Sequence, residues 1–346
     1  MGADRRRRAQ RAEGGALTSD LFTQQERNRS RSRWVVAGFI LFFAWLGLGG
    51  DYIAYLATRD APAGAYHHRV PVGGLLLTAM AAAIAAYAWN TGAQKVLWST
   101  GAREVIDPAT PEERTLVNVV DEMAIASGLP RPRIWIVPDD DPNAFATGKD
   151  EQRAHIAVTE GLLRTLSRDE LQGVVAHELG HIRNLDVRLM TILAALVGAV
   201  ALIGDGVWRM MGRGGVRFGS HGGGSRRDKK DGGNALVLVL LALWIVSWLL
   251  APLITRLLAM SVSREREYLA DAMSAQFTRN PLALASALEK LEGATAPTRA
   301  IKTGSAHLCI ADPLGGMRHV VGLFASHPPM ATRIQRLRAM GYATSR

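Results

Sequence analysis

His177-Glu178-Leu179-Gly180-His181 is the stretch that decides the fold of this chain, because it has the pattern H-E-x-x-H. In a helix, residues four positions apart lie on the same face, one turn above the other. Both imidazoles can therefore reach one tetrahedral zinc ion, with Glu178 beside the metal where a bound water would be. Zinc lowers the pKa of such a water to about 7, so a neighbouring carboxylate can take its proton during attack on a carbonyl. The alternative is a pair of surface histidines around a solvated glutamate.

The residues before and within this motif predict a helix. Ser167 and Glu170 have the spacing of a capping box, with acidic residues in the first turn. Apolar residues then recur at three- and four-residue steps, at Leu171, Val174, Val175, Leu179 and Ile182. No proline interrupts the chain from Ser167 to the low 200s, so the motif is predicted to lie inside a helix.

Four hydrophobic segments stand out: Trp34 to about Gly50, Val70 to Trp89, Leu189 to Gly204, and Ala235 to about Ile254. A hydrocarbon core of about 30 Å needs roughly 20 helical residues. The second and fourth segments meet that requirement, the first is slightly short and the third is marginal. We therefore expect a mainly α integral membrane protein with about four hydrophobic helices.

The remaining sequence is divided by these segments. Residues 1–33 form a basic tail that we expect to be disordered, and residues 34–89 are predicted to hold two transmembrane helices. Residues 90–188 and 259–346 have ordinary globular composition and are predicted to form one catalytic domain. A hydrophobic helix pair in residues 189–258 splits that domain, and the pair contains a glycine-rich basic loop at residues 212–233.

The formal charge of +10 does not by itself indicate nucleic-acid binding. Residues 1–33 contain nine arginines but, apart from Phe22, none of the aromatic residues on which single strands stack. The tail immediately precedes a hydrophobic run, so a topology signal on the cytoplasmic side of the membrane explains it better. Cys309 is the only cysteine in the sequence, which excludes an intrachain disulfide and a cysteine zinc cluster.

The order of the segments places the predicted zinc site on the cytoplasmic side. With the basic tail inside, two spans return the chain to the inside by residue 90. The zinc helix runs directly into the third segment, and if it continues unbroken the metal lies about 12 Å from the bilayer. If both later segments cross the bilayer fully, the basic loop from Trp208 to Gly233 lies outside, which is contrary to the usual excess of Lys and Arg on the cytoplasmic side. A hairpin that dips into the bilayer without crossing is the alternative.

A catalytic zinc ion usually takes three protein ligands and leaves its fourth position for water. Residues 263–271, after the fourth hydrophobic segment, have helical composition and offer two candidate carboxylates, Glu265 and Glu267. Glu267 shares a helix face with Asp271, so one of this pair could bind metal while the other orients a ligand histidine. The alternative is an ordinary charged helix with Arg–Glu pairs.

The rest of the sequence supplies shorter elements. Thr110-Pro111-Glu112-Glu113 is a second capping box, and its helix is predicted to continue to Gly128. Arg133–Val137 and His155–Thr159 are predicted to be short β-branched strands around residues 143–148. The globular part is therefore expected to be mostly α with a small sheet.

Several stretches together carry a family resemblance. Residues 177–187 (HELGHIRNLDV) precede the hydrophobic pair and residues 263–272 (SREREYLADA) follow it. Residues 143–148 (NAFATG), 156–163 (IAVTEGLL) and 326–329 (SHPP), with Arg333 and Ile334, complete the pattern. The combination closely resembles the HtpX-type membrane metalloproteases, heat-shock-induced relatives of the CAAX prenyl endopeptidases, over roughly residues 34–340. The resemblance implies a zincin-like α+β metallopeptidase domain with a small sheet.

The resemblance also implies roles for individual residues. His177 and His181 match the zinc-ligand histidines of the family, Glu178 the catalytic base, and Glu267 the third ligand. Asp271 matches a carboxylate that does not bind the metal but orients one of the ligand histidines.

Further site residues are implied by the same resemblance. His327 resembles the position proposed to stabilise the tetrahedral oxyanion, and Arg333 would support that region electrostatically. Taken alone, they are a loop histidine before two prolines and a surface arginine of a C-terminal helix. An edge strand that accepts substrate backbone as an extra strand is implied at Asn143, Ala144, Phe145 and Ala146. Its alternative is a surface turn.

We therefore expect an integral, multi-pass zinc endopeptidase of the cell inner membrane, with one zinc ion per chain. The resemblance implies misfolded or damaged membrane proteins as substrates and a role in stress response and protein quality control. Expected partners are unfolded polypeptides and the lipid bilayer, and not nucleic acid. A processing protease of the prenyl-protein type would use the same motifs, and a non-catalytic scaffold would bind zinc without cleaving peptides.

Overall fold

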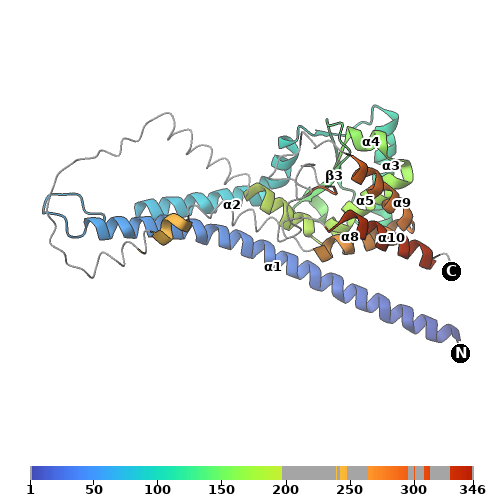
Figure 1. Ribbon diagram of the computed structural model, residues 1–346, viewed down its shortest axis with the longest axis horizontal. Helices are drawn as coiled ribbons and strands as arrows, with labels where there is room; N and C mark the ends of the chain where they lie inside the picture. Colours follow the sequence, from blue (N-terminus) through green and yellow to red (C-terminus); the bar gives the residue numbers. More distant parts are fainter. Residues whose placement is uncertain are drawn as a thin grey trace. The chain divides into compact units, whose positions relative to one another are not determined.

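The computed structural model describes residues 2–196, 239, 242–247, 264–294, 300, 308–311 and 328–344 (Figure 1). The chain divides into two compact units. Unit 1 consists of Met1–Trp34, Trp89–Ala195 and Leu258–Arg346, and unit 2 of Val35–Ala88 and Leu196–Leu257. The H-E-x-x-H motif and the stretch with the third candidate ligand both belong to unit 1.

Unit 2 contains the ends of two long helices, α1 (Gly2–Thr58) and α2 (Val72–Ser99), that pack against each other. They approach closely at two glycines, since a Cβ on Gly47 would lie 2.7 Å from the Gly74 Cα. Such small residues allow helix backbones to pack tightly in an apolar environment. Phe43, Leu46 and Ala81 form the buried cluster around this contact.

Two helices are long and apolar enough to cross a membrane, judged by length and composition. They are Gln25–Thr58 and Val72–Ser99, with mean hydropathies of 1.6 and 1.7, and they contain the first predicted segment and all but two residues of the second. Within the described residues these are two candidates and not the four that we expected. The second half of the segment at 189–204, most of the segment at 235–254 and the whole loop at 212–233 lie outside the described residues.

In the structure, residues 2–33 of the segment expected to be a disordered tail are the first part of α1. The tail lacks proline, and its many arginine, alanine, glutamate and glutamine residues favour a helix. Asn28 and Ser32 are completely buried in unit 1, so the end of this segment is also held by tertiary contacts.

Unit 1 contains a four-stranded sheet with the order β1-β2-β4-β3. The strands are β1 (Arg103–Glu104), β2 (Arg133–Val137), β3 (Ala144–Gly148) and β4 (Ala154–Thr159). β2 and β4 are parallel, while β1 and β3 each pair antiparallel with their neighbour. Two strands lie where the β-branched runs predicted them, and β3, which contains most of the N-A-F-A-T-G stretch, is at one edge of the sheet.

The zinc-motif helix α5 (Arg168–Arg183) is at the centre of unit 1 (Figure 1). It contacts β3, β4 and three helices, α3 (Pro111–Ser127), α8 (Arg264–Thr278) and α9 (Pro281–Gly293). The short helix α4 (Glu160–Thr165) precedes it, and α10 (Met330–Thr344) packs on α8 and α9. The apolar stripe predicted from the sequence is buried at Leu171, Val174, Val175, Leu179 and Ile182.

The start of α5 has the predicted capping box, with the Ser167 and Glu170 side chains bonded to each other's backbone N–H groups. Burial alone would raise the pKa of Glu170, but hydrogen bonds from Lys290, Ser286 and Ser167 outweigh it and lower the pKa to about 2. The ionised carboxylate therefore stabilises the folded state.

Glu170→Gln should lower the free energy of unfolding by about 1.5–3 kcal/mol at pH 7, because it removes a hydrogen-bonded buried charge. The folded-state pKa is depressed below the ordinary value of 4.5, so the advantage of the wild type is full above about pH 4.5. It should shrink as the pH falls toward about 2. Chemical unfolding in detergent at pH 7 and at pH 3 measures this difference. Glu289→Gln, an exposed partner of Arg338, is the control and should change stability by less than about 0.5 kcal/mol.

The helix that carries the motif is not continuous, contrary to the conditional expectation of an unbroken run into the third segment. α5 ends at Arg183, Asn184 is its C-cap, and Leu185 has a left-handed backbone with φ of 57°. Helical structure begins again at residue 186 and extends to residue 196. A left-handed residue ends many helices, and here it is a leucine, so the helix breaks without proline or glycine. The estimate of 12 Å between metal and bilayer assumed an unbroken helix and therefore does not apply.

Candidate metal centre

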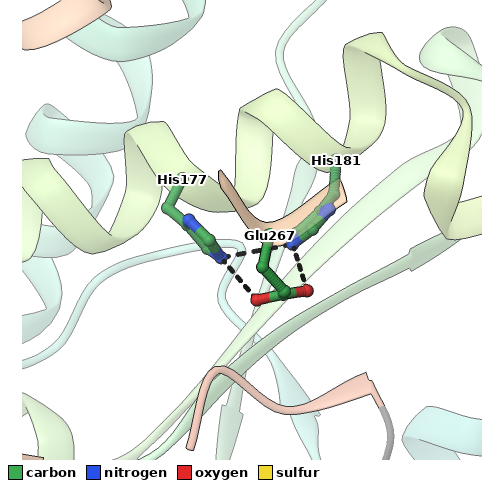
Figure 2. A group of neighbouring side chains, drawn as sticks. All are labelled: His177, His181 and Glu267. Atoms are coloured by element: carbon green, nitrogen blue, oxygen red, sulfur yellow. Dashed lines mark hydrogen bonds and ion pairs between the residues drawn. The ribbon is translucent and has the colours of Figure 1, made fainter. Parts of the chain in front are cut away.

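Two helices bring the three predicted ligands together. α5 carries His177 and His181 on one face, and α8 presents Glu267 toward them (Figure 2). The His177 Nε2 atom lies 3.2 Å from His181 Nε2 and 3.7 Å from Glu267 Oε2, and His181 Nε2 lies 3.5 Å from Glu267 Oε1. All three side chains are buried, and one ligand atom from each lies within 4.8 Å of the others.

This geometry fits a tetrahedral zinc ion. Zn–N and Zn–O bonds of about 2.0–2.1 Å at tetrahedral angles place two ligand atoms about 3.3 Å apart. The observed separations of 3.2, 3.5 and 3.7 Å are close to that value. Two imidazoles and one carboxylate are also a ligand set typical of catalytic zinc, with a fourth position left for water.

The charges around the ligands fit a divalent cation as well. Four carboxylates and two guanidinium groups are buried together, which leaves two more negative than positive charges when every carboxylate is ionised and both imidazoles are neutral. They are Glu178, Glu267, Asp186 and Asp271 with Arg266 and Arg333. Burial lowers the pKa of His181, but the carboxylates of Glu267, Asp186 and Glu178 raise it to about 9. A buried site with this excess of negative charge is stabilised by a doubly charged cation.

Each of the two histidines has its own carboxylate behind it. Asp271 Oδ1 lies 3.0 Å from His177 Nδ1, and Asp186 Oδ2 lies 3.2 Å from His181 Nδ1. Such contacts hold the imidazole ring in place and fix its tautomer, so that Nε2 is the atom offered to the metal. Burial is the main reason that the pKa of His177 is lowered to about 4, which keeps this ring in the neutral form that binds metal.

Arg333 is completely buried beside the ligands, with Nη2 3.4 Å from His177 Nε2, and is not a surface arginine. Its Nε and Nη2 atoms donate to the two oxygens of Asp271 at 2.9 and 2.7 Å, and Nη1 lies 3.5 Å from Glu267 Oε2. The guanidinium therefore fixes Asp271 and places positive charge beside Glu267. In this position Arg333 supports the ligand set from α10, the last described helix.

Sequence reasoning assigned no role to Asp186 or Arg266. Asp186 is five residues after His181, which in a continuous helix would turn it away from that histidine's face. The break at residues 184–185 brings its carboxylate back to the ring, and Arg266 Nε pairs with the other oxygen at 2.8 Å. A signal was available, since Arg266 adjoins Glu267 and Asp186 falls inside the H-E-L-G-H-I-R-N-L-D-V stretch.

Glu178 lies in the buried space beside the ligands. Burial raises the pKa of its carboxyl to about 7, with Glu267 acting in the same direction and His181 against it. The backbone of Ala146 lies close enough to lower the pKa of Glu178, but neither carboxylate oxygen has a hydrogen bond of good geometry to any part of the chain that the structure describes. A carboxyl group whose pKa is near neutral, next to a metal position, suits proton transfer.

The implied substrate strand is only partly free. β3 is the edge strand, but Phe145 pairs with Cys309, and the Ala144 carbonyl accepts from the Ile310 N–H at 2.9 Å. The Asn143 side chain donates to the Ala311 carbonyl at 3.1 Å. Residues 308–311 therefore cover the edge of β3 at Asn143–Phe145. The backbone of Ala146, the next residue of β3, lies close to Glu178. His327 lies outside the described residues.

Comparison with known proteins identifies the family of this chain. The model of peptidase family M48 matches residues 111–341, which is more than half of the sequence. The chain belongs to peptidase family M48. It is accordingly a metallopeptidase, and the predicted enzyme class is confirmed.

Relatives in this family confirm the HtpX-type resemblance. A "Protease HtpX homolog" of Thermoanaerobacter pseudethanolicus is 45% identical over 234 residues, covering 67% of this chain and 74% of that protein. Another, of Streptococcus gordonii, is 38% identical over 323 residues, covering 92% of this chain and 100% of that protein. Among solved structures, Ste24p of S. mikatae is similar with a TM-score of 0.42 and 20% identity, over 88% of this chain and 66% of that one. The family assignment depends on the sequence matches.

Proposed function

We propose that this M48 peptidase is a zinc-dependent endopeptidase of a cell membrane. The convergence of His177, His181 and Glu267 beside the buried carboxyl of Glu178 is the observation that carries the proposal. One zinc ion held by these three ligands would supply a polarised water and a positive charge for the scissile carbonyl. The two candidate membrane helices support the membrane location.

The residues of the chain perform the proton transfers. Glu178 takes a proton from the attacking water and later donates it to the leaving amine, as its pKa near 7 allows. Asp271 and Asp186 hold the two imidazoles in place, and Arg333 holds Asp271. For His327 we propose the role implied by the family resemblance, stabilisation of the oxyanion.

The proposed substrates are misfolded or damaged membrane proteins, cleaved on the cytoplasmic side. The relatives with the printed name "Protease HtpX homolog" support a protease of this type. An unfolded substrate could add its backbone to β3 near Ala146, which lies next to Glu178, or along more of the strand once residues 308–311 have moved.

A substrate panel tests the function. The full chain in detergent, loaded with zinc, is incubated with an unfolded membrane protein, the same protein folded, and a prenylated C-terminal peptide. We expect several cuts in the unfolded protein, few in the folded one, and no cleavage after a chelator has removed the metal. A single defined cut in the prenylated peptide alone would instead identify a processing protease. Bound zinc with no cleavage of any substrate would identify a scaffold.

A further inference from the structure

The end of the zinc helix is held by α1, the helix that begins the chain. The last carbonyl groups of a helix lack partners within it and need donors from elsewhere. Gln25 Nε2 donates to the Arg183 carbonyl at 2.5 Å, and Asn28 Nδ2 donates to the Asn184 carbonyl at 2.9 Å. Two side chains of α1, more than 150 residues away in sequence, thus cap α5 at the point where the chain turns.

Asn28 also reaches the carboxylate behind a metal ligand. Its Nδ2 atom donates to Asp186 Oδ1 at 2.7 Å, and Asp186 Oδ2 lies 3.2 Å from His181 Nδ1. Two contacts therefore connect α1 with the ring of His181. The Asn28 side chain is completely buried, and Ser32 donates to its backbone carbonyl at 2.8 Å, so this part of α1 is well fixed.

The amide of asparagine suits this position for a chemical reason. One NH₂ group carries two N–H donors, which here serve one carbonyl and one carboxylate oxygen. A carboxylate at position 28 would face Asp186 with like charge, and an apolar side chain would leave the Asn184 carbonyl without this donor. Arg266 pairs with the same Asp186 oxygen, so the orientation of the carboxylate is set from two directions.

We propose that Asn28 is a positioning residue of the metal centre, acting through Asp186 on His181. The basic part of α1 around Asn28 then helps to position a metal ligand and is more than a topology signal. The proposal depends on the proposed function only in taking the metal to be zinc. Asn28 and Gln25, which meet the end of α5, both belong to α1.

Zinc affinity tests the proposal independently of peptide cleavage. The full chain in detergent is titrated against a chelator of known zinc affinity, for the wild type, Asn28→Ala and Arg27→Ala. Loss of a carboxylate–histidine support typically costs 10- to 100-fold in metal affinity, and we expect a loss of about 10-fold or more for Asn28→Ala. Arg27 is the exposed neighbour on the same helix, and its variant should bind zinc as the wild type does.

A double-mutant cycle separates positioning from general stability. If Asn28 acts through Asp186, Asn28→Ala should weaken zinc binding much less in an Asp186→Ala background than in the wild type. An equal loss in both backgrounds, or Asn28→Ala binding zinc within about twofold of the wild type, overturns the proposal. Should Asn28→Ala not fold, Asn28→Ser is measured instead, since its shorter side chain cannot serve both acceptors and the same limits apply. A wild type that binds no zinc would contradict the proposed function and not this contact.

Discussion

Glu178→Gln should abolish peptide cleavage while zinc stays bound at about one ion per chain. The glutamine side chain has nearly the same shape but cannot accept the proton of the attacking water. General base catalysis contributes about 10²–10⁴-fold, so we expect cleavage to fall by about 10³-fold or more. Zinc should remain because Glu178 is not one of the three converging ligands.

Bound zinc and cleavage of an unfolded protein are measured side by side for this variant. Asp169→Asn is the matched control, because Asp169 is an exposed acidic residue in the first turn of the same helix. We expect the control to cleave as the wild type does. Equal cleavage by the wild type and Glu178→Gln would remove Glu178 from the role of base, and loss of zinc in Glu178→Gln would indicate a ligand role.

Glu267→Ala should lose the metal itself. The variant keeps both histidines but removes one of the three ligands and one buried negative charge, while Arg333 stays beside the site. We expect zinc affinity to fall by more than the 10- to 100-fold that is typical for loss of an outer supporting residue. Cleavage should fall with occupancy, so that a large excess of zinc restores part of it.

Glu265→Ala is the natural control for this prediction. Glu265 is the other carboxylate that the sequence offered as third ligand, yet it is exposed on α8, whereas Glu267 is buried. Since zinc stabilises the folded state that binds it, the thermal midpoint of the wild type should drop on addition of a chelator. The Glu265→Ala variant should show the same drop and Glu267→Ala almost none. The reverse pattern would make Glu265 the ligand.

Prediction from sequence succeeded where the responsible physics is local. The capping box at Ser167, the apolar steps along α5 and the β-branched runs of β2 and β4 each depend on residues within one element. Prediction failed where an element is held by distant parts of the chain. The end of α5 was not foreseen because the turn at Leu185 contains neither proline nor glycine.

The sequence by itself determined the chemistry of the centre. Two histidines four residues apart must share a helix face, and the residue types around them are those of a zinc hydrolase. Between Glu265 and Glu267, spacing alone only favoured the latter, because Asp271 shares its face.

Only the tertiary structure decided which groups surround the ligands. Glu267 is buried, and the carboxylate of Asp186 contacts His181. Arg333 forms an ion pair with Asp271, and Asn28 donates hydrogen bonds at the end of α5. The physical reason is that helix periodicity acts over a few residues, whereas these contacts join positions up to 158 residues apart. Such contacts form only when the packed core has fixed where each helix ends.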